Sequence, residues 1–216
     1  MSEEKQRKLA FVRSLHTKSD GCFTFKHGMS AVIAGVNAPR DCPKAKQNPE
    51  RAIIDVQVYE RCGYEQGARR TELEEFIKSA VEWVVLSNEY PRGLVNVCTQ
   101  IIKDDGSIEA VTVNSAMCAL LQSGVDMKGI VVGVCAAGIR NDDDMTYRII
   151  LDPDSSINAR WKVFTVWDVN MGSLVTMKME GKCTDIQLKE TLDMTKGLAK
   201  KLLSTIKKII EKQYSH

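Results

Sequence analysis

Hydrophobic and polar residues alternate in several short stretches of the first half of the chain, and this alternation is typical of half-buried β-strands. It predicts two neighbouring strands at residues 22–25 and 29–36, which we expect to pair as a hairpin. The alternation returns at residues 53–59 and 94–102. Residues 37–51 contain three prolines among charged side chains, so this segment is predicted to be a surface loop.

Three stretches have the spacing of apolar residues that a helix requires. The first is predicted to begin at Thr71, because Thr71 and Glu74 have the spacing of a capping box, in which the two side chains bind early backbone N–H groups. The second spans about residues 114–123 and ends at Gly124, and the third, opened by another capping box, spans residues 184–213. The core-facing stripe of the first helix is Leu73, Phe76, Ile77, Ala80, Val81 and Val84.

The second half of the chain is richer in strands than the first. Four antiparallel strands are predicted there, at residues 130–137, 147–151, 161–168 and 174–180. The order of strands and helices indicates an α+β fold in which sheets pack against flanking helices. We expect a single domain over residues 1–216, with a core segment at 10–127 and a strand-rich segment at 128–213.

The charges of the chain are nearly balanced, with 30 basic and 28 acidic residues and a formal net charge of +2. A dedicated DNA-binding protein is usually far more basic, so any affinity for nucleic acid is expected to come from local patches. No apolar run approaches the roughly 18 residues of a membrane span, and no signal-peptide core is visible. We therefore expect a soluble, non-secreted protein without a membrane partner.

The seven cysteines are scattered along the chain without any CxxC pair, and several lie in apolar runs. These features favour reduced thiols over disulfides or a zinc site. The histidines, which are His16, His27 and His216, have no ligand spacing relative to one another or to the cysteines. No metal site and no cofactor are therefore predicted.

Several short motifs follow one another in a fixed order along most of the chain. They are Ser19-Asp20-Gly21, Lys26 to Ala34, Asn37-Ala38-Pro39, Tyr90-Pro91-Arg92, Gln100, Asp105-Gly106-Ser107, residues 114–127 and Asp152-Pro153. In this order and spacing they resemble the motifs of the ribonuclease-PH superfamily of phosphorolytic RNA-processing proteins. The resemblance implies a ribonuclease-PH-like fold, also described as ribosomal S5 domain-two-like, with mixed and antiparallel sheets packed against helices.

Within that superfamily the chain resembles the small ring subunits of the eukaryotic RNA exosome, because it has no S1 or KH additions and because of its motifs at residues 91–127. Members of the superfamily form six-membered rings around an RNA channel, and the eukaryotic rings generally pass RNA to separate hydrolytic nucleases. The resemblance therefore implies a non-catalytic ring subunit for 3'-to-5' RNA processing and degradation, including rRNA processing. Its expected partners are the other exosome ring subunits and RNA, and its expected location is the nucleus, the nucleolus and the cytoplasm.

Phosphorolysis needs cations and N–H groups that hold inorganic phosphate, next to a carboxylate that supports proton transfer or a metal. In active relatives a Thr-Arg pair follows the Asp-Gly turn, whereas this chain has Ile108 and Glu109 there, and a carboxylate would repel phosphate. Active relatives also have two acids about six residues apart. Here Asp152 takes the first position and the neutral Asn158 the second, with Asp154 as a nearby substitute. No catalytic residue is expected, and Asp152 and Asp154 are the residual candidates.

Four cations are predicted to contact RNA, namely Arg69, Arg70, Lys78 and Arg92. They precede, lie on or follow the first predicted helix, and we expect them to cluster at one end of it. Cations that neutralise phosphates give a salt-dependent and sequence-independent grip, which suits a channel through which RNA slides. The alternative for each of the four is a solvated helix face or a subunit-interface ion pair.

Other hypotheses stay open for the chain as a whole. One is a stand-alone homodimeric nuclease, or a nucleic-acid-binding protein, that acts on RNA or DNA and uses Asp152 or Asp154 with a metal ion. Another is a protein with this fold but with different partners. The lysines of the last predicted helix favour a solvated amphipathic face over a nucleic-acid patch.

Overall fold

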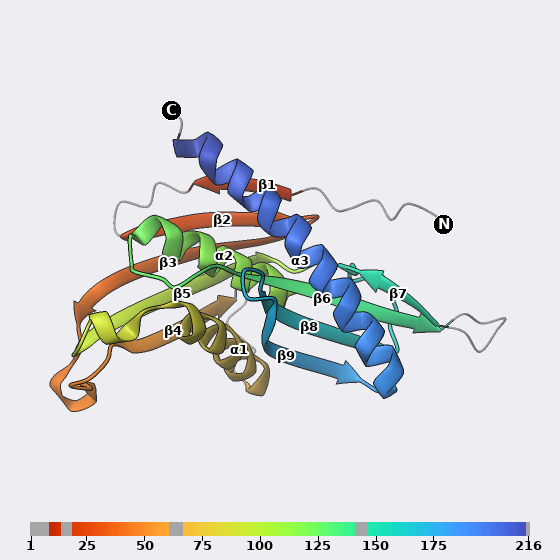
Figure 1. The fold of residues 1–216 in the computed structure, drawn as a ribbon, viewed down its shortest axis with the longest axis horizontal. Coiled ribbons are helices and arrows are strands. Elements are labelled where there is room, and N and C mark those ends of the chain that lie inside the picture. Colours follow the sequence, from red (N-terminus) through yellow and green to blue (C-terminus); the bar gives the residue numbers. More distant parts are fainter. Residues whose placement is uncertain (1–8, 14–18, 61–66, 141–146, 215–216) are drawn as a thin grey trace.

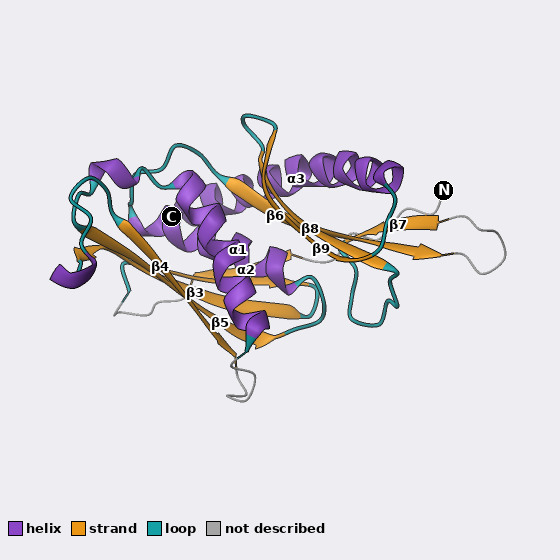
Figure 2. Cartoon of the chain, turned by 90° about the horizontal axis from the view of Figure 1, so that it is seen from below, coloured by secondary structure: helices purple, strands orange, loops and turns teal. Residues whose placement is uncertain are grey.

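The computed structural model describes residues 9–13, 19–60, 67–140 and 147–214 of the chain (Figure 1). In these ranges the chain forms a five-stranded sheet, a four-stranded sheet and three α-helices. Figure 2 shows two of the helices between the sheets and the third on the outer face of the four-stranded sheet. The predicted α+β class, with mixed and antiparallel sheets packed against helices, is therefore confirmed.

The five-stranded sheet has the order β1-β2-β3-β5-β4. Its strands are β1 (Leu9–Arg13), β2 (Gly21–His27), β3 (Ser30–Asp41), β4 (Ile53–Glu60) and β5 (Gly93–Lys103). Neighbouring strands are antiparallel except for β4 and β5, which are parallel and are connected through α1 (Ala68–Val84). A parallel pair requires such a crossover, because the chain must return to the same end of the sheet.

The four-stranded sheet has the order β7-β6-β8-β9 and is entirely antiparallel. Its strands are β6 (Val131–Arg140), β7 (Tyr147–Leu151), β8 (Trp161–Asp168) and β9 (Ser173–Gly181). The long helix α3 (Asp185–Tyr214) packs against β6, β7 and β8. Since helices cover both faces of β6, its residues 131–138 are all buried, which explains why they form one continuous apolar run.

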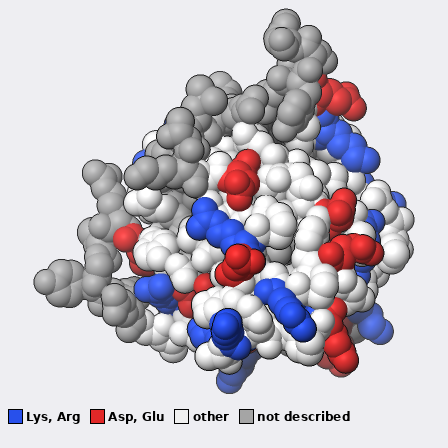
Figure 3. All heavy atoms as spheres, turned by 90° about the vertical axis from the view of Figure 1, so that its left-hand side faces the viewer, with Lys and Arg blue, Asp and Glu red and all other residues white. Residues whose placement is uncertain are grey.

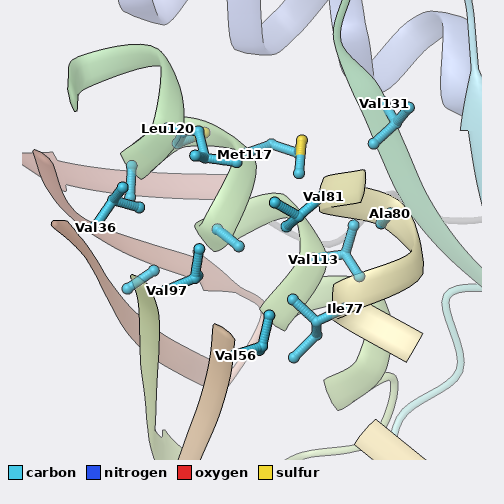
Figure 4. Close-up of a cluster of buried hydrophobic side chains, with 14 of the residues drawn as sticks. Val36, Val56, Ile77, Ala80, Val81, Val97, Val113, Met117, Leu120 and Val131 are labelled. Carbon is cyan, nitrogen blue, oxygen red and sulfur yellow. The ribbon is translucent and has the colours of Figure 1, made fainter. Parts of the chain in front are cut away.

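Helix α2 (Ile108–Ser123) lies between the two sheets and is buried along most of its length. It packs on β2 and β3 on one side and on β6 on the other. A helix covered on several sides needs apolar or small residues around its whole circumference, and α2 has them. Its side chains Met117 and Leu120 share the larger core cluster with Val36 and Val97 of the five-stranded sheet (Figure 4).

The predicted start of α2 is wrong, because the helix begins at Ile108 and not at Asn114. Residues 108–113 include four β-branched side chains, which favour strands when they are considered alone. Their burial between two sheets outweighs this preference. The predicted end is confirmed, because Gly124 takes the left-handed conformation with φ of 77°.

The predicted start of α1 is also wrong, because the helix begins at Ala68 and not at Thr71. The Glu74 carboxylate does not close a capping box with Thr71. It accepts the backbone N–H of Val58 at 3.0 Å and the Nε–H of Arg70 at 2.8 Å, so it links α1 to β4 instead. The predicted core stripe of this helix is confirmed, since all six of its residues are buried.

The capping box at the start of α3 is confirmed. The backbone N–H of Thr184 donates to the Gln187 side chain at 2.9 Å, and the backbone N–H of Gln187 donates to the Thr184 hydroxyl at 3.4 Å. The helix that follows begins at Asp185, as the two side chains indicate.

The predicted strands are all present, but the loop prediction for residues 37–51 is only partly right. β3 continues to Asp41 and pairs with β5 beyond a bulge at Ala38 and Pro39. The bulge removes these two residues from the ladder, so the missing N–H of Pro39 costs no hydrogen bond there. Strand β1 was not predicted.

Asn114 of α2 joins the helix to β6 through two buried hydrogen bonds. Its side-chain N–H donates to the Gly133 carbonyl at 2.9 Å, and the Gly133 N–H donates to its side-chain oxygen at 2.8 Å. We expect Asn114→Ala to lower the free energy of unfolding by about 2–4 kcal/mol, because both backbone groups of Gly133 lose their partners.

Urea denaturation measures this change. The matched control is Asn88→Ala at an exposed position, which should alter the free energy of unfolding by less than about 0.5 kcal/mol. Equal effects of the two substitutions would show that the Asn114 hydrogen bonds contribute nothing.

Candidate functional site

The candidate site lies where two turns meet. The first turn, residues 104–107, connects β5 to α2, and the second, residues 152–156, follows β7. The hydroxyl of Ser107 donates a buried hydrogen bond of 2.8 Å to the Pro153 carbonyl. Both turns belong to the sequence motifs, and the fold brings them into contact.

Gly106 allows this close contact between the turns. A β-carbon at this position would lie 2.9 Å from the carbonyl carbon of Asp154, and the backbone φ is +86°. The Ser30 hydroxyl fixes the same turn, because it donates to the Gly106 carbonyl at 3.0 Å and accepts the N–H of Asp105 at 2.9 Å. Any side chain at Gly106 would therefore push the two turns apart.

Ile108 and Glu109, which the sequence resemblance places at the anion-binding pair, are both buried in the first turn of α2. Ile108 is 2% exposed and belongs to the larger core cluster, and Glu109 is 5% exposed. The Lys178 ammonium of β9 lies 3.7 Å from the Glu109 carboxylate and also contacts Glu72 at 3.1 Å. The cation nearest to this position is thus already neutralised by carboxylates.

The charged state of Glu109 is disfavoured by its surroundings. Burial raises the pKa of its carboxyl above the ordinary glutamate value, and the opposing effects of its own backbone N–H and of Lys178 are smaller. Burial acts to lower the pKa of Lys178, but the hydrogen bond to Glu72 and the charges of Glu109 and Glu180 outweigh it, so that pKa is raised. A phosphate would therefore have to bind next to the buried Glu109 carboxyl and next to Lys178, which already contacts three carboxylates.

Asp152, the residual catalytic candidate, is held by a histidine. His27 Nε2 lies 2.8 Å from Asp152 Oδ2, and the two side chains are 6% and 11% exposed. The backbone of Asp152 is left-handed, with φ of 54°, and its N–H donates to the Cys135 carbonyl at 2.8 Å. The carboxylate therefore has a structural partner from β2 within the first sheet.

The second position of the expected acidic pair, six residues after Asp152, does not carry a carboxylate. Asn158 is neutral and lies exposed in the segment before β8. The Asp154 carboxylate accepts the backbone N–H of Ser156 at 3.0 Å, which is the bond of an ordinary Asx turn.

The four predicted RNA-contacting cations do not cluster at one end of α1, so that expectation is wrong. Arg69 and Arg70 lie in the first turn of α1, where they pair with Asp104 at 3.1 Å and with Glu74 at 2.8 Å. Arg92 lies beyond the other end of α1, just before β5. A helix of 17 residues is about 25 Å long, so these positions are far apart.

Lys78 lies on the exposed face of α1 and lines a cavity together with Lys46 and Arg51. No motif in the sequence selects Lys46 and Arg51, because they belong to the proline-containing segment predicted as a loop. Only the packing of that segment against α1 brings them next to Lys78.

Six cysteines in the described part of the chain are free thiols, and burial raises the pKa of Cys118 to about 12. Cys62, His16 and His216 lie outside the described residues. Among the described residues, no group of three or more His, Cys, Asp or Glu side chains is arranged to hold a metal ion. No helix in the same residues is long and apolar enough to cross a membrane.

Comparison with known families gives a match to RNase PH, the 3' exoribonuclease family, domain 1, over residues 5–126. The chain belongs to the RNase PH family. The first turn of the site and the helix α2 lie within the matched residues. Ile108 and Glu109 therefore lie within the part of the chain that matches the family.

Several RNase PH family members resemble this chain over much of its length. It is 24% identical to the exosome complex component Rrp41 of Archaeoglobus fulgidus, over 98% of this chain and 84% of that protein. It is 32% identical to the exosome complex component rrp46 of Schizosaccharomyces pombe, over 69% of this chain and 65% of that protein. The crystal structure of rice Rrp46 superposes with a TM-score of 0.80 at 21% identity, covering 92% and 91% of the two chains, which shows a shared fold.

The raised pKa of Glu109 predicts a change in how stability depends on pH. Because the pKa of Glu109 is higher in the folded than in the unfolded protein, protonation of this group stabilises the fold. This stabilisation is fully present below the ordinary glutamate pKa of about 4.3. It is lost as the pH rises through the folded-state pKa. The free energy of unfolding of the wild type should therefore fall relative to that of Glu109→Gln across this window.

Urea denaturation of both proteins at several pH values from about 4 upward measures the difference. The control is Glu75→Gln, which removes an exposed carboxylate on α1 and should follow the wild-type profile. Parallel profiles for the wild type and Glu109→Gln would contradict the assigned environment of Glu109.

Proposed function

We propose that the protein is a non-catalytic ring subunit of an RNA exosome, which joins neighbouring ring subunits and contacts RNA during 3'-to-5' processing and degradation. Its membership of the RNase PH family supports this role, as do relatives named exosome components that align with most of the chain. A structure of the Archaeoglobus fulgidus exosome with RNA bound to the active site also superposes on this chain, with a TM-score of 0.74 at 18% identity.

The environment of Glu109 carries the non-catalytic part of the proposal. A phosphorolytic site needs positive charge where phosphate binds, whereas this chain places a buried carboxylate there and engages the nearest lysine with several acids. The His27 contact to Asp152 supports the same conclusion, because it gives that carboxylate a structural role.

The RNA-contacting part of the proposal rests most strongly on Lys78 and Arg92. Arg69 and Arg70 already have carboxylate partners at 3.1 Å and 2.8 Å, so their charges are partly offset. A ring subunit of this kind is proposed to act in the nucleus, the nucleolus and the cytoplasm, which imaging of a fluorescent fusion would test.

Affinity purification of the tagged protein from cells that express it tests the ring assignment directly. We expect the other exosome ring subunits to co-purify in comparable amounts, because a ring subunit is held on both sides by its neighbours. Cells that express the tag alone are the control. Recovery of the tagged protein without any exosome subunit would contradict the proposal.

A further inference from the structure

A cavity of about 540 Å³ opens where the middle of α1, the start of β4 and the segment before β4 meet. Three cations line it, namely Lys46, Arg51 and Lys78, and the lining includes a single acid, Glu82. The lining therefore has an excess of two positive charges, although the chain as a whole is nearly neutral.

The cations of this cavity are available to a ligand. Lys78 pairs only loosely with Glu82, at 3.9 Å, and the two side chains are 46% and 53% exposed. Within the described residues, no ion pair involves Lys46 or Arg51. Arg69 and Arg70, in contrast, both have close carboxylate partners.

The wall that carries Lys46 and Arg51 is fixed to the rest of the fold. The backbone N–H of Ala52 donates to the Ser87 carbonyl at 2.8 Å, and that of Arg92 donates to the Asn48 carbonyl at 2.9 Å. These bonds hold the segment against the chain that leaves α1. A cavity with fixed walls presents its charges at lower entropic cost than a mobile loop does.

The lining of the cavity indicates the kind of ligand that it accepts. Its volume falls in the range of about 300–1,000 Å³ that is usual for small-molecule pockets, which is enough for a phosphate with its sugar. None of its lining residues is aromatic, so it offers neither a base-stacking platform nor the aromatic anchors that are typical of peptide-binding sites. Lysine and arginine without stacking partners favour a phosphodiester over a base or a peptide side chain.

The cavity is separate from the two turns of the candidate site. Arg69, at the start of α1, contacts Asp104 of the first turn, and Lys78 lies nine residues further along the helix, about 14 Å along its axis. Figure 3 shows the side of the molecule on which the segment before β4 lies. Lys and Arg side chains are spread over the lower part of this view, with Asp and Glu side chains between them.

We propose that the cavity of Lys46, Arg51 and Lys78 binds a phosphate group of single-stranded RNA, at a site distinct from the turn site of the family. The inference rests on the proposed contact with RNA and names where on the surface that contact is made. Binding is independent of sequence, because only the backbone of the RNA is held.

Fluorescence anisotropy with a labelled single-stranded RNA and the full-length protein tests this site. We expect Lys46→Gln/Arg51→Gln to weaken binding on the order of tenfold at low salt. The magnitude of the slope of log K against log [salt] should fall by about 0.7, since each neutralised phosphate of a single strand contributes about 0.7 and the cavity holds one. Glu82→Gln should tighten binding, because it removes the only acid of the cavity.

The control is Lys200→Gln/Lys207→Gln on the exposed face of α3, which removes the same net charge elsewhere. An equal loss of affinity in the control would overturn the proposal, since binding would then follow net charge alone. The proposal would also be overturned if Lys46→Gln/Arg51→Gln bound RNA as tightly as the wild type, or if Glu82→Gln did not bind it more tightly. A misfolded variant would lose affinity, so misfolding cannot produce the gain of affinity that we expect for Glu82→Gln.

The failure of this site can be distinguished from the failure of the ring assignment. If the wild-type protein co-purifies with exosome subunits but the cavity variants bind RNA as tightly as the wild type, only the site is wrong. If the protein recovers no exosome subunits, the ring assignment is wrong whatever the anisotropy shows.

Discussion

The burial of α2 between the two sheets is the constraint on which the rest of the structure depends. The helix contacts β2 and β3 on one side and β6 on the other, so nearly all its residues must be apolar, small or internally satisfied. The buried hydrogen bonds of Asn114 with the backbone of Gly133 fix its position against β6. Because α2 follows directly after the turn at residues 104–107, its placement also fixes where that turn meets the second one.

The same burial decides what chemistry the site retains. The first residues of α2 face inward, so a side chain such as Ile108 joins the core and an acid such as Glu109 must find a cation. Lys178 supplies that charge from β9, and the two side chains form an internal ion pair. The fold of an RNase PH protein is kept. We propose that the buried carboxylate at this position is incompatible with the phosphate binding that phosphorolysis requires.

Periodicity in the sequence was enough to predict most of the strands and the buried stripe of α1, because alternation and helical spacing are local properties. The starts of α1 and α2 were not predictable in this way. Glu74 has the spacing of a capping box but binds Val58 of β4, and the strand-like residues at the start of α2 become helical only through contact with both sheets. In both cases a tertiary contact outweighs a local preference.

The candidate site was predictable in part. The motifs identified the two turns and the substitutions at Ile108 and Glu109, but not the partner Lys178, which is distant in sequence. Nor did they predict that Asp152 is bound by His27, since that contact depends on how β2 lies beside the second turn. The cavity with Lys46 and Arg51 was missed for the same reason, because its residues come together only when the segment before β4 packs on α1.

We propose that the buried carboxylate of Glu109 has removed phosphorolysis, and the rest of the functional account depends on this loss. It is tested most directly by incubating the purified protein with labelled RNA, with and without inorganic phosphate and Mg²⁺, beside a phosphorolytic member of the family as positive control. We predict that no nucleoside diphosphates are released under any of these conditions. Release of nucleoside diphosphates that requires phosphate and is abolished by Asp152→Asn would contradict the claim.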